Sequence, residues 1–155
     1  MGWALLESGP KYIDSGILSA GRLNLKYQDY RLKVIDLCQA WAFGALNSRK
    51  PDALVSELLP VTGFNNMSQA ILAQAAVTAV QTAACHLHIP VVQVSAQTVK
   101  TRIGGSPNAT KVKVRNGVLE ILPELEDKKG AWVKVFDEPD AIAVGLTYLG
   151  HDIRA

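Results

Sequence analysis

Short apolar runs alternate with long helical repeats along this chain, and this alternation is the feature that most restricts its fold. Two short runs, 2–7 and 12–18, flank turn residues at 8–10 and predict a β-hairpin. From Arg22 to about Asn47, apolar residues recur at steps of three and four, as an amphipathic helix requires. Because a proline cannot continue a helix, this helix is expected to end before Pro51.

The remainder of the chain continues the same alternation. The expected elements are a buried strand over 53–59, a loop over 60–66, an alanine-rich helix over 68–86, a strand over 91–94, helices over 96–101 and 110–122, an acidic link, and a last helix over 137–148. Strands that alternate with helices predict an α/β fold, in which helices cover both faces of a mixed sheet. Because no repeat or low-complexity tract interrupts the chain, residues 1–155 are expected to form a single domain.

Length and composition exclude several classes of protein. A chain of 155 residues that is 48% hydrophobic and 19% charged carries too much apolar material to be intrinsically disordered. Its apolar runs are far shorter than the roughly 20 residues of a membrane span, and its start lacks the basic region of a signal peptide. Cys38 and Cys85 lie in apolar helical patterns, which argues against a disulfide framework. We therefore expect a soluble cytoplasmic protein that does not contact a membrane.

Charge is unevenly distributed, although the net charge is only +2. Residues 58–119 contain no acidic side chain, and the last third of this stretch holds five bases: Lys100, Arg102, Lys111, Lys113 and Arg115. Residues 120–155 carry eight acids against four bases. The basic block is attractive to a polyanion, whereas the acidic terminus would repel one unless a bound cation neutralised it. A solvated helix face is the alternative interpretation of the basic block.

Three carboxylates lie in surroundings that make a charge costly or directional. Glu57 lies in an apolar strand, and Asp137 and Asp140 open an apolar helix at spacing i, i+3 on one face. Carboxylates are the ligands that Mg²⁺ and Mn²⁺ prefer, so an oxygen-only metal site is one interpretation. The other is that Asp137 caps the helix, with Glu138 and Asp140 as ordinary first-turn acids that favour its positive end.

Seven segments of the chain carry a family resemblance in their order and spacing: residues 2–4, 12–17, 51–57, 72–75, 89–91, 98–100 and 137–143. The most specific are the strand that ends in Glu57 and the terminal Asp-x-x-Asp-Ala motif at 137–141. Together these segments resemble the RuvC-type Holliday junction resolvases of the ribonuclease H-like superfamily. The resemblance covers nearly the whole chain. It implies a ribonuclease H-like α/β fold and a homodimeric endonuclease that cleaves four-way DNA junctions with divalent cations.

The resemblance also assigns roles to individual side chains. It implies that Glu57, Asp137 and Asp140 hold Mg²⁺, with Mn²⁺ as an alternative, and that Lys100 and Lys111 meet the scissile phosphate. The residues expected to bind DNA are Phe64, Lys100, Arg102, Lys111, Lys113 and Arg115. The alanine-rich helix around 72–80 would lie at the dimer interface, although a plain core helix explains its composition equally well. A branch-migration helicase is a further partner that the resemblance suggests.

Two departures from the family pattern bear on these expectations. The family begins with a strand that bears a first catalytic aspartate, directly before the segment that Met1 to Ala4 resembles. We expect this strand upstream of Met1; the alternative is a relative that binds branched DNA without cleaving it. The second departure is Pro60, where many relatives carry an aromatic residue that stacks on an unpaired base. Phe64, in the same loop, is the expected substitute.

Overall fold

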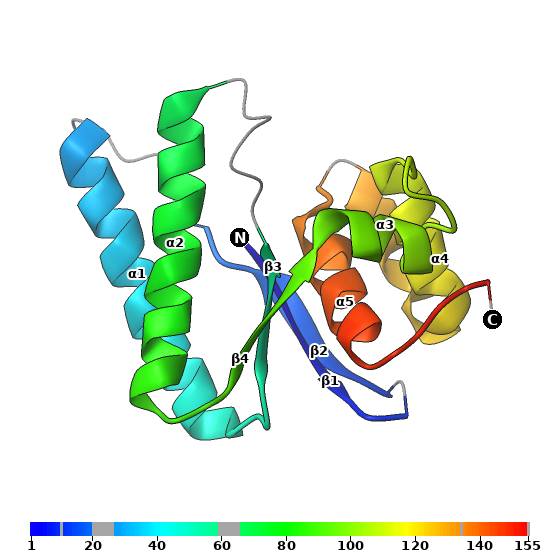
Figure 1. The fold of residues 1–155 in the computed structure, drawn as a ribbon, viewed down its shortest axis with the longest axis horizontal. Coiled ribbons are helices and arrows are strands. Elements are labelled where there is room, and N and C mark those ends of the chain that lie inside the picture. The colour runs from blue at the N-terminus through cyan, green and yellow to red at the C-terminus, as the bar shows by residue number, and fades with distance from the viewer. Residues whose placement is uncertain (10, 20–26, 59–65, 134, 155) are drawn as a thin grey trace. The chain divides into compact units, whose positions relative to one another are not determined.

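The computed structural model describes residues 1–9, 11–19, 27–58, 66–133 and 135–154. Figure 1 shows the order of the elements along the chain. They are β1 (Gly2–Glu7), β2 (Lys11–Ile17), α1 (Tyr27–Arg49), β3 (Leu54–Leu58), α2 (Met67–His86), β4 (Val91–Ser95), α3 (Ala96–Ile103), α4 (Lys111–Ile121), the 3₁₀ helix η1 (Pro123–Val133) and α5 (Asp137–Tyr148). The α/β class predicted from the sequence is confirmed.

The strands pair in twos. β1 and β2 form the predicted antiparallel hairpin, whose register runs from Gly2 opposite Ile17 to Glu7 opposite Lys11. An irregularity between Leu5 and Leu6 shifts the register by one residue. β3 pairs with β4, and α2 is the chain segment that connects these two strands.

The described chain groups into two compact units, one of residues 19–92 and one that joins residues 1–18 to residues 93–155. The prediction of a single domain remains a prediction. Among the described residues, no helix is both long enough and apolar enough to cross a membrane.

In the unit of residues 19–92, α1 packs against α2, as Figure 1 shows. Every fourth residue of α1 from Val34 to Leu46 is buried, and on α2 Ala83 and Ala84 are fully buried. Such small side chains let two helix backbones approach closely. A hydrogen bond from Gln81 Nε2 to Ser56 Oγ (2.9 Å) also ties α2 to β3.

In the other unit, α5 packs against β1, β2, α3 and α4. Its core is built from apolar side chains of α3, α4, η1 and α5, of which the largest fully buried ones are Trp132, Ile103, Leu122, Ile142, Leu146 and Val118. A methyl group on Gly117 would lie 1.7 Å from the carbonyl oxygen of Ile103. Because only glycine allows this approach, Gly117 sets how closely α4 packs on the end of α3.

Side chains define the beginning of three helices. Asn66, Ser95 and Thr110 each accept a hydrogen bond from a backbone N–H of the first turn, at α2, α3 and α4 respectively. Such caps satisfy N–H groups that have no partner within the helix. The segment expected as an acidic link is instead η1, which buries Leu125 and Trp132. Burial of these two apolar side chains explains why a charged stretch adopts regular structure.

Candidate functional site

The first turn of α5 carries three acidic residues, Asp137, Glu138 and Asp140. Asp137 is the first helical residue, and the capping position is occupied by Phe136, which provides no side-chain hydrogen bond. The interpretation of Asp137 as a helix cap is therefore wrong. Asp137 and Asp140 are three positions apart, so they share the face of the helix end at which the helix dipole favours negative charge.

An ion pair joins the beginning of α4 to the beginning of α5. The ammonium Nζ of Lys111 lies 2.9 Å from Oδ2 of Asp140 and 5.7 Å from the ring centroid of Phe136. Asp140 is 31% exposed and Lys111 61% exposed, so water reaches both partners. Two residues that the family resemblance assigned to one catalytic site, 29 positions apart, are thus in direct contact.

Asp137, the other aspartate of this turn, lies beside the β1–β2 hairpin. The α-amino group of Met1 is 3.9 Å from Oδ2 of Asp137. A methyl group on Gly2 would lie 1.8 Å from the carbonyl oxygen of Asp137, so glycine is required for β1 to pass this close to the helix. The chain path at β1 therefore depends on a glycine that directly contacts the turn bearing the carboxylates.

The donors available to a metal ion are carboxylate oxygens. Asp137 and Asp140 fit a hard divalent cation by their chemistry, because Mg²⁺ and Mn²⁺ select oxygen ligands. Within the described residues, no three His, Cys, Asp or Glu side chains gather closely enough to hold a metal ion. Glu57 is half-buried on β3, in the unit of residues 19–92, whereas both aspartates belong to the other unit.

The predicted DNA-binding bases lie on two neighbouring helices. Lys100 and Lys113 are exposed, on α3 and α4 respectively. Arg102, half-buried on α3, donates a hydrogen bond to the carbonyl oxygen of Thr147 (3.4 Å). This contact ties Arg102 to the last turn of α5. Arg115 is half-buried on α4 and donates to Oδ1 of Asn116 (3.3 Å). Phe64, the remaining member of the predicted set, lies outside the described residues.

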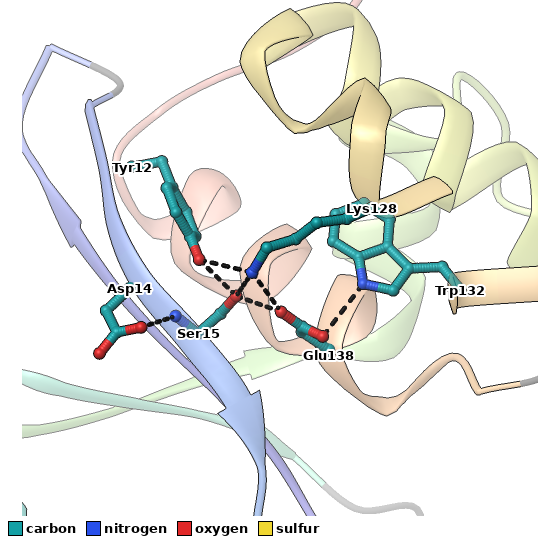
Figure 2. A network of polar contacts seen from close by, with 6 residues as sticks. All are labelled: Tyr12, Asp14, Ser15, Lys128, Trp132 and Glu138. Atoms are coloured by element: carbon teal, nitrogen blue, oxygen red, sulfur yellow. Dashed lines mark hydrogen bonds and ion pairs between the residues drawn. The ribbon is translucent and has the colours of Figure 1, made fainter. Parts of the chain in front are cut away.

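Glu138 is the centre of a polar cluster that also contains Tyr12, Ser15, Lys128 and Trp132 (Figure 2). Its Oε1 accepts hydrogen bonds from Ser15 Oγ (2.5 Å) and from Lys128 Nζ (2.9 Å), and its Oε2 accepts one from Trp132 Nε1 (3.1 Å). Lys128 Nζ also donates to the hydroxyl groups of Tyr12 (2.7 Å) and Ser15 (3.3 Å). We call these five residues the Glu138 cluster.

The Glu138 cluster holds two charges that are largely removed from water. Glu138 is 14% exposed and Lys128 is 32% exposed. Burial on its own would raise the pKa of Glu138, but hydrogen bonds from Ser15, Lys128 and Trp132 outweigh it and lower that pKa below its ordinary value. Burial would likewise lower the pKa of Lys128, but the bonds to Tyr12 and Glu138 outweigh it and raise that pKa. Both groups are therefore charged at neutral pH.

Sequence reasoning did not identify the Glu138 cluster. Glu138 has the pattern of an ordinary first-turn acid, and Trp132 that of a core residue. The contact between Ser15 and Glu138 spans 123 positions, and no local spacing signals it. The one available hint is the pair Lys128 and Lys129, two bases that follow an acidic stretch and precede Trp132 by a few positions.

Comparisons with known proteins rest on structure alone. No protein-family model matches this chain, and no curated protein matches its sequence. The structure of RuvC from Thermus thermophilus matches with a TM-score of 0.67 and 20% identity over 94% of this chain and 82% of the Thermus chain. A structure of T. thermophilus RuvC in complex with a Holliday junction substrate matches with a TM-score of 0.70 and 20% identity over 88% of this chain and 76% of that one. The chain therefore has a RuvC-like fold.

Proposed function

We propose that this protein is a divalent-metal-dependent endonuclease that resolves four-way DNA junctions by phosphodiester hydrolysis. The observation that carries the proposal is the contact of Lys111 with Asp140 at the beginning of α5, beside Asp137, within a RuvC-like fold. One of the solved structures of this fold is described as RuvC in complex with a Holliday junction substrate. Branched DNA is therefore the substrate that we assign to this chain.

In the proposed chemistry, carboxylates bind the metal ion and lysines contact the phosphate. Asp137, Asp140 and Glu57 are the proposed ligands of Mg²⁺ or Mn²⁺, and a cation held there supplies Lewis acidity and a more acidic bound water. Lys111 and Lys100 are proposed to meet the scissile phosphate, where an ammonium group stabilises the charge that develops. In the state described here, Lys111 neutralises Asp140. Its long side chain can exchange this carboxylate for a phosphate when DNA arrives.

The basic helices α3 and α4 are the proposed contact with the DNA backbone. Lys100 and Lys113 are exposed there. Lysine contacts to phosphates release condensed counterions, so we expect junction binding to weaken as salt rises. A homodimer and a branch-migration helicase are further proposed partners, and both follow from the family resemblance. Light scattering on the purified protein tests the dimer.

A cleavage assay on a synthetic four-way junction tests the proposed function. The protein is incubated with a labelled junction in Mg²⁺, in Mn²⁺ and in chelator, and with linear duplex of the same sequence as the control substrate. We expect metal-dependent cuts in the junction and none in the duplex. The variant Asp140→Asn is expected to bind the junction and not cut it. Cleavage that survives this substitution would contradict the assigned metal site.

A non-cleaving module that binds branched DNA is the second candidate. It is favoured by the finding that Asp140 is already neutralised by Lys111. A gel-shift titration separates the two candidates. Specific binding of the junction without cleavage in either metal would support the module, whereas cleavage would support the nuclease.

A further inference from the structure

The first turn of α5 begins without the usual means of fixing a helix end. Phe136 at the capping position makes no side-chain hydrogen bond, in contrast to Asn66, Ser95 and Thr110 at the other described starts with assigned caps. The backbone N–H of Asp140 bonds to the carbonyl of Phe136 (2.9 Å), so the turn itself is formed. An uncapped helix end frays readily. Asp137 and Asp140 lie on this turn.

From this we infer that Glu138 is a positioning residue, which anchors the first turn of α5 through the Glu138 cluster and so holds Asp137 and Asp140 in place. The inference rests on the proposed function in one respect, namely that Asp137 and Asp140 are metal ligands. Glu138 is adjacent to one aspartate and two residues from the other, but its carboxylate is directed away from solvent into the cluster, as Figure 2 shows.

The cluster connects α5 to two other elements at once. Ser15 and Tyr12 belong to β2, while Lys128 and Trp132 belong to η1. Both oxygens of Glu138 are engaged, one by Ser15 and Lys128 and the other by Trp132. A carboxylate held at both oxygens from two directions can neither rotate nor shift without losing a bond. The turn that carries it is therefore restrained in position and in rotation about the helix axis.

The hydrogen-bonding capacity of Lys128, the cation of the Glu138 cluster, is also fully used. The ammonium group of Lys128 has three protons and meets three acceptors, namely the hydroxyl of Tyr12, Oγ of Ser15 and Oε1 of Glu138. It lies 5.0 Å from the ring centroid of Tyr12 as well. A partly buried charge pair with its bonds satisfied on both sides is costly to disrupt. Removal of one partner leaves the other charge partly buried and without its counter-charge. Outer residues that orient metal ligands act in this manner.

Amide hydrogen exchange tests the inference directly, without metal or DNA. The exchange rates of the Asp140, Ala141 and Ile142 amides are compared in the unaltered protein, in Glu138→Ala, and in Val99→Ala. The last variant is the matched control, because it opens a cavity at a buried residue of α3 outside the Glu138 cluster. We expect Glu138→Ala to speed exchange at these three amides by about tenfold or more beyond the control. Glu138→Gln, which keeps one acceptor oxygen, should fall between Glu138→Ala and the unaltered protein.

A Mn²⁺ titration followed by electron paramagnetic resonance gives the second measurement. Loss of the anchor is expected to weaken Mn²⁺ binding by about tenfold or more in Glu138→Ala, and not in Val99→Ala. Equal exchange at the α5 amides in Glu138→Ala and Val99→Ala overturns the inference. If the unaltered protein binds no Mn²⁺ but Glu138→Ala still loosens the turn, the proposed metal site fails while the positioning role of Glu138 stands.

Discussion

Lys111 and Asp140 form an ion pair of 2.9 Å between the first residue of α4 and the first turn of α5. The two side chains have the charges that a nuclease would direct at a phosphate and at a metal ion. In their contact, the positive charge of Lys111 offsets the negative charge of Asp140 before a metal ion or a phosphate binds. Competition between the lysine and a metal ion for the same carboxylate is the direct consequence.

Removal of the lysine should therefore strengthen cation binding. In Lys111→Ala, Asp140 loses its neutralising partner, and we expect tighter Mn²⁺ binding together with weaker junction binding. Because the pair is solvent-exposed, the free energy of unfolding should change by no more than about 1 kcal/mol. Mn²⁺ titration, gel shift and urea unfolding measure the three quantities. Lys129→Ala is the control, since Lys129 also pairs with an acid, Glu126, on an exposed surface. Unchanged Mn²⁺ affinity in Lys111→Ala would contradict the competition.

The lowered pKa of Glu138 predicts a specific dependence of stability on pH. An acid whose pKa is lower in the folded state stabilises the fold fully above its unfolded value of 4.5, and this contribution disappears as pH falls through the folded pKa. Glu138→Gln should therefore be less stable than the unaltered protein at neutral pH, and the difference should shrink below pH 4.5. Urea unfolding at a series of pH values measures this difference.

A second acid with a shifted pKa does not disturb that measurement. Hydrogen bonds from Arg154 lower the pKa of Asp152 from 3.8 to about 2. Its effect is the same with and without Glu138, so it cancels when the two proteins are compared. A stability difference that stays constant from neutral pH to about pH 3 would show that Glu138 does not act through its charge.

Trp132 has a donor role in addition to its role in the core. Trp132→Phe keeps an aromatic ring at this buried position but leaves Oε2 of Glu138 without its indole donor. An unsatisfied, largely buried carboxylate oxygen costs about 1–3 kcal/mol, so we expect a loss of unfolding free energy in this range. In the double variant with Glu138→Gln the total loss should be smaller than the sum of the two single losses, because the two residues share the bond to Oε2. Additive losses would contradict the coupling.

Two glycines in helices provide a matched test of close packing. At Gly117 an added methyl group would lie 1.7 Å from the backbone oxygen of Ile103, whereas at Gly44 in α1 it would meet no atom of the described chain within 4 Å. We expect Gly117→Ala to lose about 3 kcal/mol or more of unfolding free energy. Gly44→Ala should gain up to about 1 kcal/mol through helix propensity. Urea unfolding measures both, and a tolerated Gly117→Ala would contradict the close α3–α4 contact.

Local pattern was sufficient for most of the secondary structure. The hairpin, the α/β order and the helices were all predictable, because side-chain periodicity, prolines and turn residues act within a few positions of each other. The sequence pattern did not predict the helix η1. Most residues at 124–129 are charged, so the segment has the pattern of an exposed link, although Leu125 and Trp132 are buried. Their burial depends on packing against α4, which the local sequence does not specify.

For the candidate site as well, some features follow from the sequence and others only from the tertiary structure. The sequence by itself determined that Asp137 and Asp140 share a helix face, because a spacing of three residues in a helix leaves no alternative. Only the tertiary structure decided that Lys111 meets Asp140 and that Glu138 turns inward to Ser15, Lys128 and Trp132. These contacts join residues from separate elements. Their geometry follows from how apolar cores bring those elements together, which no spacing along the chain encodes.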